Sequence, residues 1–383
     1  MYSYFSKELT ARFSKKEKKD SGIFFTPPRF IQHNLELLPL TEVLRVLEPS
    51  CGSGEYIDAL SSFPHLQVTG IEKNEIMCRS SPRPILNMDF LEYETSEKFD
   101  LIIGNPPYFV MKKSDVAKKY HEFFDGRPNI FILFIIKSLE LLKDDGYLSF
   151  VLPANFLNSL SYEKTRKQLA QFKILHIVEC KEKYLETQQD TILLVVQKTK
   201  SHDSFDFKGY TIFTTEENRM KLSKLYEDST TLKDLGFRVK VGTIVWNQCK
   251  EILTDDSTKT RLIYSSDICD NSIILKKYKD EKKKNYIKKE GSNDLTLVIN
   301  RGYGKGEYIF NYCLITGEET YLIENHLISV EYTQEISRED LMILYTKIMS
   351  SFDDERTREF IRIYFGNNAI NTTELNNILP IYL

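Results

Sequence analysis

The chain has 383 residues, of which 41% are hydrophobic and 28% are charged, and its formal net charge is -3. This length predicts two domains or one large one, with enough apolar residues for sizeable cores. The near balance of charge excludes a strongly basic nucleic-acid binder by composition, but it leaves room for a local basic face.

Cysteine usage and the N-terminal residues indicate the cellular compartment. The six cysteines form no Cys-x-x-Cys pair and the six histidines lack metal-ligand spacing, so we expect reduced thiols and no metal. Residues 1–20 are polar and lysine-rich, and they read as a mobile or helical arm without the apolar core of a signal peptide. No run of about 18 apolar residues is present, so no membrane span is expected. We therefore expect a cytoplasmic protein.

The first predicted helix covers residues 29–38 and follows a threonine and two prolines. Thr26 stands directly before Pro27 and Pro28. This order suits an N-cap followed by proline in the first helical turn. Taken alone, Thr26 is explained best by such capping.

A strand, a glycine-rich loop and a helix come next. Residues 43–47 are predicted as the strand, Glu48 to Gly54 as the loop and residues 55–60 as the helix. This order is typical of the opening of a nucleotide-binding doubly wound fold. A second strand over residues 68–71 ends at Glu72. An acidic residue about 20 positions after the first glycine is placed to bind ribose hydroxyls.

Two further strands also end in polar residues. Residues 85–86 lead to Asp89 and Phe90, an acid and an aromatic that could bind an amino group and flank a ring. The alternative is a surface loop whose phenylalanine packs into the core. The apolar run after Asp100 reads as a buried parallel strand and stops at Asn105 to Tyr108. The two prolines there make the turn rigid. A bare Asn-Pro-Pro is equally compatible with an ordinary proline turn.

The segment 110–127 is polar and basic, and we expect it to be too irregular for the core. A loop of this length beside a site is more often functional or mobile than filler, although its lysines also fit a solvated face. A strongly apolar helix is predicted over residues 129–142, a strand over 147–152 and a helix over 161–172. Two more strands are predicted over 174–179 and 191–197. This alternation predicts a parallel α/β sheet.

The second half begins at a boundary between Lys198 and Asp206, where the alternation gives way to short, irregular segments. Residues 231–305 hold 16 Lys+Arg and 10 Asp+Glu, whereas residues 306–383 hold 5 and 13. The densest basic patch lies within residues 276–289 and is compatible with phosphate contacts or with a solvated lysine run. Residues 301–306 form a glycine-rich loop with two cations, which suits a close backbone approach.

Taken in order, these motifs resemble gamma-type N6-adenine DNA methyltransferases of type II restriction–modification systems. The motifs are Thr26-Pro-Pro, Glu48 to Gly54, Glu72, Asp89-Phe90 and Asn105 to Tyr108. The resemblance covers roughly residues 21–197. It implies an S-adenosylmethionine-binding catalytic domain (1–200) with a doubly wound, mostly parallel seven-stranded α/β sheet. A mixed α/β target-recognition domain (206–383) would follow.

The resemblance also implies roles for individual residues. Glu72 would bind the ribose hydroxyls of the cofactor, and Asp89, Phe90 and Phe134 would hold its adenine. The methionine part would be held by Thr26, Glu48, Pro49, Ser50, Cys51, Gly52 and Gly54. The catalytic loop would consist of Asn105, Pro106, Pro107 and Tyr108, of which Asn105 and Pro107 also border the cofactor. Tyr184 would stack on the extruded base, although residues 186–190 depart from the family's pattern.

The residue types of the catalytic loop suit amino-group methylation. An adenine amino group is a poor nucleophile, because its lone pair is delocalised into the ring. The Asn105 side-chain oxygen and the Pro106 carbonyl can each accept one N6 hydrogen, which favours direct transfer without a covalent enzyme intermediate. Extruding the base costs a few kcal/mol, and stacking recovers roughly 1–3 kcal/mol per base.

The expected partner is double-stranded DNA, and a restriction endonuclease acting on the same site is a second one. Candidate DNA-binding residues are Lys112, Lys113, Lys282, Lys283, Lys284, Arg301 and Lys305. We expect a monomer. Three other substrates stay open: an RNA adenine, a protein glutamine amide and an N4 of cytosine. A non-catalytic nucleic-acid-binding subunit is a further alternative, against which the intact Asn105 to Tyr108 motif argues.

Overall fold

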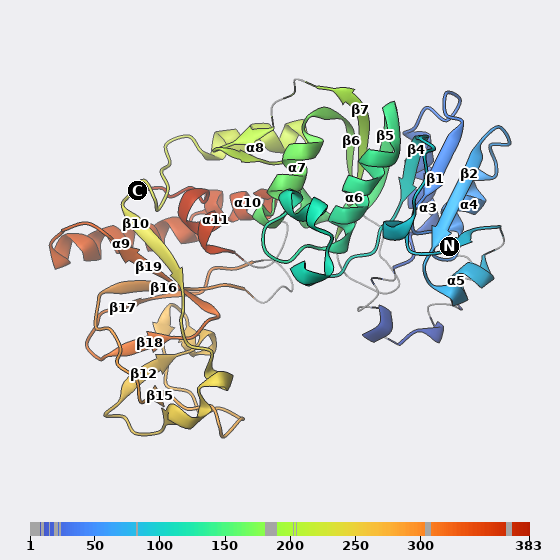
Figure 1. Ribbon diagram of the computed structural model, residues 1–383. Coiled ribbons are helices and arrows are strands. Elements are labelled where there is room, and N and C mark those ends of the chain that lie inside the picture. The colour runs from blue at the N-terminus through green and yellow to red at the C-terminus, as the bar shows by residue number, and fades with distance from the viewer. Residues whose placement is uncertain are drawn as a thin grey trace. The chain divides into compact units, whose positions relative to one another are not determined.

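The computed structural model (Figure 1) describes residues 8, 11–14, 16–18, 22, 24–81, 83–180, 190–201, 203, 205–302, 308–364 and 370–383. The chain divides into two compact units, Met1–Thr215 and Glu216–Leu383. This division falls after the boundary region 198–206 that the sequence indicates.

The first unit is built on a seven-stranded sheet with the strand order β3-β2-β1-β4-β5-β7-β6. β7 runs antiparallel to both of its neighbours, and the other pairs are parallel. The predicted mostly parallel seven-stranded sheet is therefore confirmed. The strands are β1 (Arg45–Glu48), β2 (Gln67–Glu72), β3 (Leu86–Asn87), β4 (Phe99–Gly104), β5 (Leu142–Pro153), β6 (Phe172–Cys180) and β7 (Thr191–Lys200).

Helices cover both faces of this sheet (Figure 1). The helices are α3 (Pro28–Glu36), α4 (Glu55–Leu60), α5 (Glu75–Ser80), α6 (Ile130–Leu141) and α7 (Glu163–Leu169). β4 shows the layering, because Leu101 and Ile103 belong to a core cluster with residues of α3 and α4. Ile102, which points to the opposite face, belongs to a second cluster with α6. A strand buried on both faces explains the continuous apolar run in the sequence.

The segment 110–127 differs from its prediction. Val116, Tyr120 and Phe124 are buried, so the expectation that this segment is too irregular for the core is wrong. The segment contains two short 3-10 helices, η2 (Lys113–Asp115) and η3 (Lys118–Phe123). A bridge between Val110 and Asn129 closes it at the base. Widely spaced apolar residues in a polar segment carry no regular period, which is why the pattern did not reveal them.

The second unit contains two four-stranded sheets, with the orders β10-β19-β16-β17 and β11-β15-β12-β18. Its helices include α9, which is 16 residues long, so the expectation of only short, irregular segments is wrong. The strands are β10 (Phe237–Val241), β11 (Leu253–Thr254), β12 (Thr260–Ile263), β15 (Tyr286–Ile287), β16 (Thr296–Asn300), β17 (Tyr312–Ile315), β18 (Tyr321–Ile323) and β19 (Leu327–Tyr332). The helices are α8 (Glu216–Leu225), α9 (Arg338–Asp353), α10 (Glu355–Tyr364) and α11 (Thr372–Asn377). Each unit also has a short two-stranded hairpin. In the first unit it consists of β8 (Asp206–Phe207) and β9 (Tyr210–Thr211), and in the second of β13 (Ile268–Cys269) and β14 (Ser272–Ile273).

Two expectations from composition can be compared with the structure. All six cysteines are free thiols, in agreement with the absence of a disulfide pattern. Among the described residues, no helix is long and apolar enough to span a membrane.

Candidate active site

The site lies where the strand order of the first unit reverses. β1 and β4 are adjacent and parallel, with Val46 opposite Leu101, and β2 and β5 continue the sheet on either side. The loops that leave the carboxyl ends of β1 and β4 therefore diverge from a common crevice, which is the usual ligand position in an open α/β sheet. The Ser50 hydroxyl donates to the Asn105 carbonyl at 3.2 Å, which ties these two loops together.

A cavity of about 610 Å³ opens at this crevice. Predicted residues that line it are Pro49, Ser50, Gly52, Glu72, Asp89, Phe90, Asn105, Pro107 and Phe134. Residues that line it without having been predicted are Gly22, Phe24, Phe25, Lys73, Asn74, Glu75, Met77, Phe109 and Ile130. This volume is within the range of small-molecule and cofactor sites.

Glu72 is held in place at the end of β2 by backbone donors. Its two carboxylate oxygens accept from the Gly52 N–H at 2.8 Å and the Asn74 N–H at 2.7 Å. Burial raises the pKa of Glu72, and these N–H groups act in the opposite direction. Each oxygen keeps acceptor capacity for a further hydrogen bond. The carboxylate therefore suits a pair of ligand hydroxyls.

The residues after β3 present an acid and an aromatic ring, and α6 adds a second ring. Asp89 accepts from the Leu91 N–H at 2.9 Å and pairs with Lys73 at 2.8 Å. The Lys73 side chain is 75% exposed, so a ligand amino group can compete for this carboxylate. Phe90 and Phe134 are buried, with ring centroids 4.9 Å apart. Both phenylalanines belong to a core cluster and also line the cavity.

Glu48 lies buried behind the glycine loop and is not among the described residues that line the cavity. Burial raises the pKa of Glu48 well above its usual range. Its Oε2 atom is buried and has no hydrogen-bond partner among the described residues. Cys51, which is also buried, has a raised pKa for the same reason and does not have the character of a nucleophile.

The glycines of the loop have backbone conformations that explain their positions. Gly52 and Gly54 have φ values of 56° and 84°, and Gly54 caps α4. Both values lie in the left-handed region, which a side chain disfavours. The loop can thus turn sharply from β1 into the helix.

Asn105 is fixed by three hydrogen bonds at the end of β4. Its Nδ2 atom donates to the Phe24 carbonyl at 3.2 Å and to the Thr26 Oγ1 at 3.1 Å. Its Oδ1 accepts from the Tyr108 hydroxyl at 2.5 Å. Because both amide hydrogens are donated within the protein, only the oxygen has capacity to receive a substrate hydrogen.

Tyr108 and Thr26 have surroundings that the sequence did not predict. Tyr108 is buried, and its ring stacks on Phe24 with centroids 5.9 Å apart. Phe131 meets the ring edge-on at 6.0 Å. Thr26 does not cap α3, because Pro27 holds the N-cap position and no described side chain caps the helix, so the capping interpretation is wrong.

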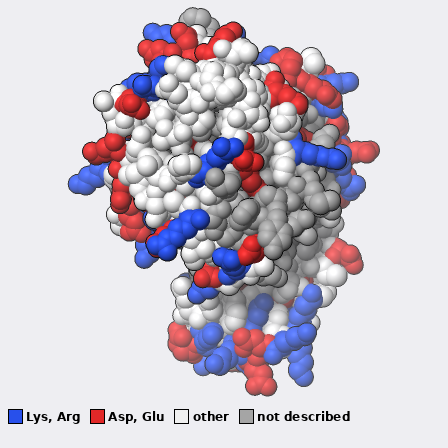
Figure 2. All heavy atoms as spheres, turned by 90° about the vertical axis from the view of Figure 1, so that its right-hand side faces the viewer, with Lys and Arg blue, Asp and Glu red and all other residues white. Residues whose placement is uncertain are grey.

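The remaining predicted positions concern base stacking and DNA contacts. Tyr184 and Lys305 lie outside the described residues. Lys112 and Lys113 are exposed, and the Lys113 ammonium lies 5.9 Å from the Phe124 ring centroid. Acidic and basic side chains are interspersed over the face shown in Figure 2. The described surface in that view has no broad region of a single charge.

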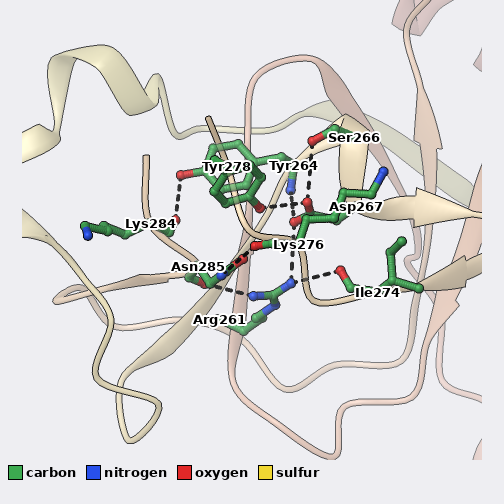
Figure 3. A network of polar contacts seen from close by, with 9 residues as sticks. All are labelled: Arg261, Tyr264, Ser266, Asp267, Ile274, Lys276, Tyr278, Lys284 and Asn285. Atoms are coloured by element: carbon green, nitrogen blue, oxygen red, sulfur yellow. Dashed lines mark hydrogen bonds and ion pairs between the residues drawn. The ribbon is translucent and has the colours of Figure 1, made fainter. Parts of the chain in front are cut away.

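In the second unit, a buried polar network holds the segment that carries the dense basic patch (Figure 3). Asp267 accepts from the Tyr278 hydroxyl at 2.7 Å and from the Tyr264 N–H at 3.1 Å, and it pairs with Arg261 at 3.5 Å. The Tyr264 hydroxyl donates to the Lys284 carbonyl at 2.8 Å. Arg261 and Asp267 are both buried. The segment is therefore anchored by interactions that its lysine-rich composition does not indicate.

Two lysines of the patch have partners inside the unit. The Lys283 ammonium lies 3.9 Å and 4.4 Å from the ring centroids of Tyr264 and Tyr278, and burial lowers its pKa. Lys284 forms an ion pair with Asp255 at 2.7 Å. Lys282 is exposed. Arg301 donates to the Asn325 carbonyl at 3.3 Å.

Three other lysines gather around an open groove of about 460 Å³. β12 runs parallel to β18 and antiparallel to β15, so the start of β12 and the end of β15 meet at one edge of the sheet. The groove at this edge is lined by Thr258, Lys259, Thr260, Ile287, Lys288, Lys289, Glu290 and Thr320. All three lysines are exposed. The Thr260 hydroxyl donates to the Lys289 carbonyl, 29 positions away in sequence. The sequence did not predict this groove, because its residues meet only when the two strands pair.

The fold and the cavity define an S-adenosylmethionine-dependent methyltransferase. Glu72, Asp89 and Phe90 line the cavity, where the sequence predicts that they hold the ribose and the adenine of that cofactor. The predicted cofactor is confirmed by the methylase relatives of the chain.

Comparisons with known proteins give the family. A family model described as "Eco57I restriction-modification methylase" matches residues 58–185. The type II methyltransferase M.CvrRI of Paramecium bursaria Chlorella virus XZ-6E is 31% identical over 98% of each chain. The modification methylase CviBIII of Paramecium bursaria Chlorella virus NC1A is 26% identical over 98% of each chain. The protein belongs to the type II restriction–modification methylase family.

A solved structure covers the whole length at lower similarity. The type IIG restriction endonuclease BpuSI matches 98% of this chain and 60% of its own, with 13% identity and a TM-score of 0.45.

Proposed function

We propose that the protein methylates N6 of an adenine that is flipped out of double-stranded DNA, and that it protects DNA from a restriction endonuclease of the same specificity. The observation that carries this proposal is the fixed amide of Asn105. Both of its N–H hydrogens are donated to Phe24 and Thr26, so it offers an acceptor at the edge of the cofactor cavity. A substrate amino group carries N–H hydrogens, so it requires a hydrogen-bond acceptor at this position.

The loop residues act on the target nitrogen. Asn105 Oδ1 and the Pro106 carbonyl each accept one N6 hydrogen, which draws the lone pair out of the ring and orients the nitrogen. The bound S-adenosylmethionine supplies the methyl group. Fixed acceptors of this kind lower the barrier because they need no reorganisation during the reaction. Cys51 takes no part, because its thiol is buried and its pKa is raised.

Stacking on the extruded base is assigned to Tyr108 and Tyr184. The Tyr108 ring already stacks on Phe24. A base that stacks on that face of Tyr108 must therefore replace Phe24. Stacking of about 1–3 kcal/mol per base helps to offset the cost of unstacking the duplex.

We further propose that the second unit recognises the DNA target, and that the protein acts as a monomer. The lysine groove, formed by Lys259, Lys288 and Lys289 with their neighbours, is the part of this unit that we assign to phosphate contacts. Lys112, Lys113 and Lys282 are exposed and remain candidates for the same role. Lys283 and Lys284, which already have partners in the unit, are assigned to holding the segment.

Product identification tests the proposed reaction. The purified protein is incubated with radiolabelled S-adenosylmethionine and, separately, with double-stranded DNA, RNA and a protein mixture. Each product is digested to nucleosides or amino acids and separated by chromatography. Label in N6-methyladenine from DNA supports the proposal. Label in N4-methylcytosine, in RNA or in methylglutamine overturns the substrate assignment.

Asn105→Ala tests the role of the loop. The variant removes the acceptor while leaving the cavity wall open, so turnover should fall below detection. The Kd for S-adenosylmethionine, measured by calorimetry, should change by no more than about threefold, since the other cofactor contacts persist. Turnover equal to that of the wild type would overturn the mechanism.

A further inference from the structure

The Asn105 amide is held by a segment that lies far from it in sequence. Its Nδ2 atom donates to the Thr26 Oγ1 at 3.1 Å, across 79 positions, and to the Phe24 carbonyl at 3.2 Å, across 81 positions. An asparagine side chain has two donor hydrogens and one acceptor oxygen. Both hydrogens are engaged here, so the orientation of the amide is set before any substrate arrives.

Thr26 does not have the capping role that its sequence context offers. It does not cap α3, whose N-cap is Pro27. The cavity wall, as far as the described residues form it, includes Phe24 and Phe25 but not Thr26. The side chain is only 4% exposed, and its oxygen contacts Asn105. The geometry thus directs the hydroxyl to the catalytic amide.

We propose that Thr26 is a positioning residue for the reaction: its hydroxyl, together with the Phe24 carbonyl, keeps Asn105 Oδ1 as the acceptor of a substrate amino hydrogen. This inference rests on the proposed amino-group methylation. Rotation of the amide by about half a turn would exchange Nδ2 and Oδ1 and place Oδ1 against the Phe24 carbonyl, an acceptor against an acceptor. The Phe24 carbonyl, which can only accept, opposes that rotation, and the Thr26 hydroxyl adds the second acceptor that holds Nδ2 in place.

The backbone around Thr26 supports this function. The residue precedes Pro27, whose ring restricts the conformation of the residue before it. Pro27 itself accepts the first helical hydrogen bonds of α3, from the Phe30 and Ile31 N–H groups. The hydroxyl is therefore presented from a stiff turn at the start of the helix. A rigid support suits a group that must hold another side chain within a fraction of an ångström.

Two substitutions separate positioning from cofactor binding. Thr26→Val keeps the branched shape and removes the acceptor, whereas Thr26→Ser keeps the hydroxyl. We measure the single-turnover rate at saturating S-adenosylmethionine with DNA, the KM for DNA and the calorimetric Kd for the cofactor. The Thr26→Val rate should fall about 10- to 100-fold, in line with the effect of a small misplacement of a reacting group. Its cofactor Kd should change by no more than about threefold, and Thr26→Ser should recover most of the rate.

The other outcomes are decisive as well. A raised cofactor Kd in Thr26→Val, with a normal rate at saturation, would overturn the proposal and assign Thr26 to the cofactor's methionine part. Equal rates in Thr26→Val and the wild type would also overturn it. Thermal unfolding of each variant shows whether it is folded, and Thr26→Ala replaces Thr26→Val if the valine variant is not. The ratio of the Thr26→Val rate to the Thr26→Ser rate can be measured on whichever amino group the wild type methylates. The positioning proposal can therefore fail while the adenine assignment holds, and the adenine assignment can fail while the positioning proposal holds.

Discussion

The hydroxyl oxygen of Tyr108 lies 2.5 Å from the Oδ1 atom of Asn105. The same hydroxyl lies 2.8 Å from the Val151 carbonyl on β5. A tyrosine has a single O–H hydrogen, so it can satisfy only one of these acceptors at a time. A hydrogen that moves to Val151 leaves the full acceptor capacity of Oδ1 for a substrate amino group.

Tyr108→Phe tests this shared hydrogen. The ring and its packing persist, and the variant loses one hydrogen bond, which costs about 1 kcal/mol of unfolding free energy. We expect the methylation rate to fall less than about tenfold, because Phe24 and Thr26 still orient the Asn105 amide. Urea unfolding and single-turnover kinetics measure the two effects. A rate loss as large as that of Asn105→Ala would show that the hydroxyl itself is essential.

Gly22 must lie against the catalytic loop. It has a φ of 64°, and a Cβ there would lie 2.5 Å from the Tyr108 nitrogen and 2.9 Å from the Pro107 Cβ. We expect Gly22→Ala to abolish or strongly reduce methyl transfer, because the Asn105 to Tyr108 loop must shift. Gly126→Ala is the matched control, since Gly126 has a φ of 67° and a Cβ there would meet none of the described atoms within 4 Å.

Both variants include the cost of a left-handed backbone, which is about 1–2 kcal/mol. Only Gly22→Ala adds the steric contact with the loop. Its loss of unfolding free energy and of activity should therefore exceed that of Gly126→Ala. Equal effects in the two variants would mean that the loop tolerates the methyl group.

Glu48 makes the cofactor-free protein sensitive to pH. Burial raises its pKa, and the carboxylates of Glu72 and Glu55 raise it further, while the Cys51 thiol lowers it. The folded state then binds its proton more tightly than the unfolded chain does. Stability from this group is fully present below the unfolded pKa of about 4.5 and is lost as pH rises towards the folded pKa. Glu72, whose pKa is also raised, contributes in the same direction.

Urea unfolding between pH 5 and pH 8 measures this dependence. We expect Glu48→Gln, which cannot ionise, to flatten the decline in unfolding free energy at rising pH. Glu97→Gln serves as the control because that glutamate is 54% exposed on the surface. The same decline in Glu48→Gln and the wild type would contradict the assignment.

The lysine groove predicts a salt dependence of DNA binding. Replacing Lys259, Lys288 and Lys289 by glutamine should weaken binding to all DNA sequences alike. Each phosphate contact that is lost should reduce the slope of log K against log salt by about 0.9. Fluorescence anisotropy at several salt concentrations measures the slope. Lys347→Gln, an exposed charge on α9 of the same unit, is the control, and a slope unchanged in the triple variant would exclude the groove.

Much of the first unit can be predicted from sequence alone. Short apolar runs separated by glycine and proline turns encode the strands, and polar residues at their ends mark the ligand edge. Glu72, Asp89 and Asn105 lie at that edge as predicted, because each stands at or just after the end of a strand, and parallel strands bring their carboxyl ends together. This pattern involves only residues that are close in sequence, so it can be recognised without the structure.

The tertiary structure decided how those residues are used. It made Thr26 a partner of Asn105 instead of a helix cap, buried Tyr108 against Phe24, and placed the Lys283 ammonium close to the rings of Tyr264 and Tyr278. These contacts join residues that are distant in sequence, and they depend on how the strands and turns pack. Sequence determined the polar turn from Asn105 to Tyr108 at the edge of the parallel sheet, the turn that we propose as the methylation loop. The packing of distant segments determined which side chains orient that loop, because no local pattern specifies a contact across 79 residues.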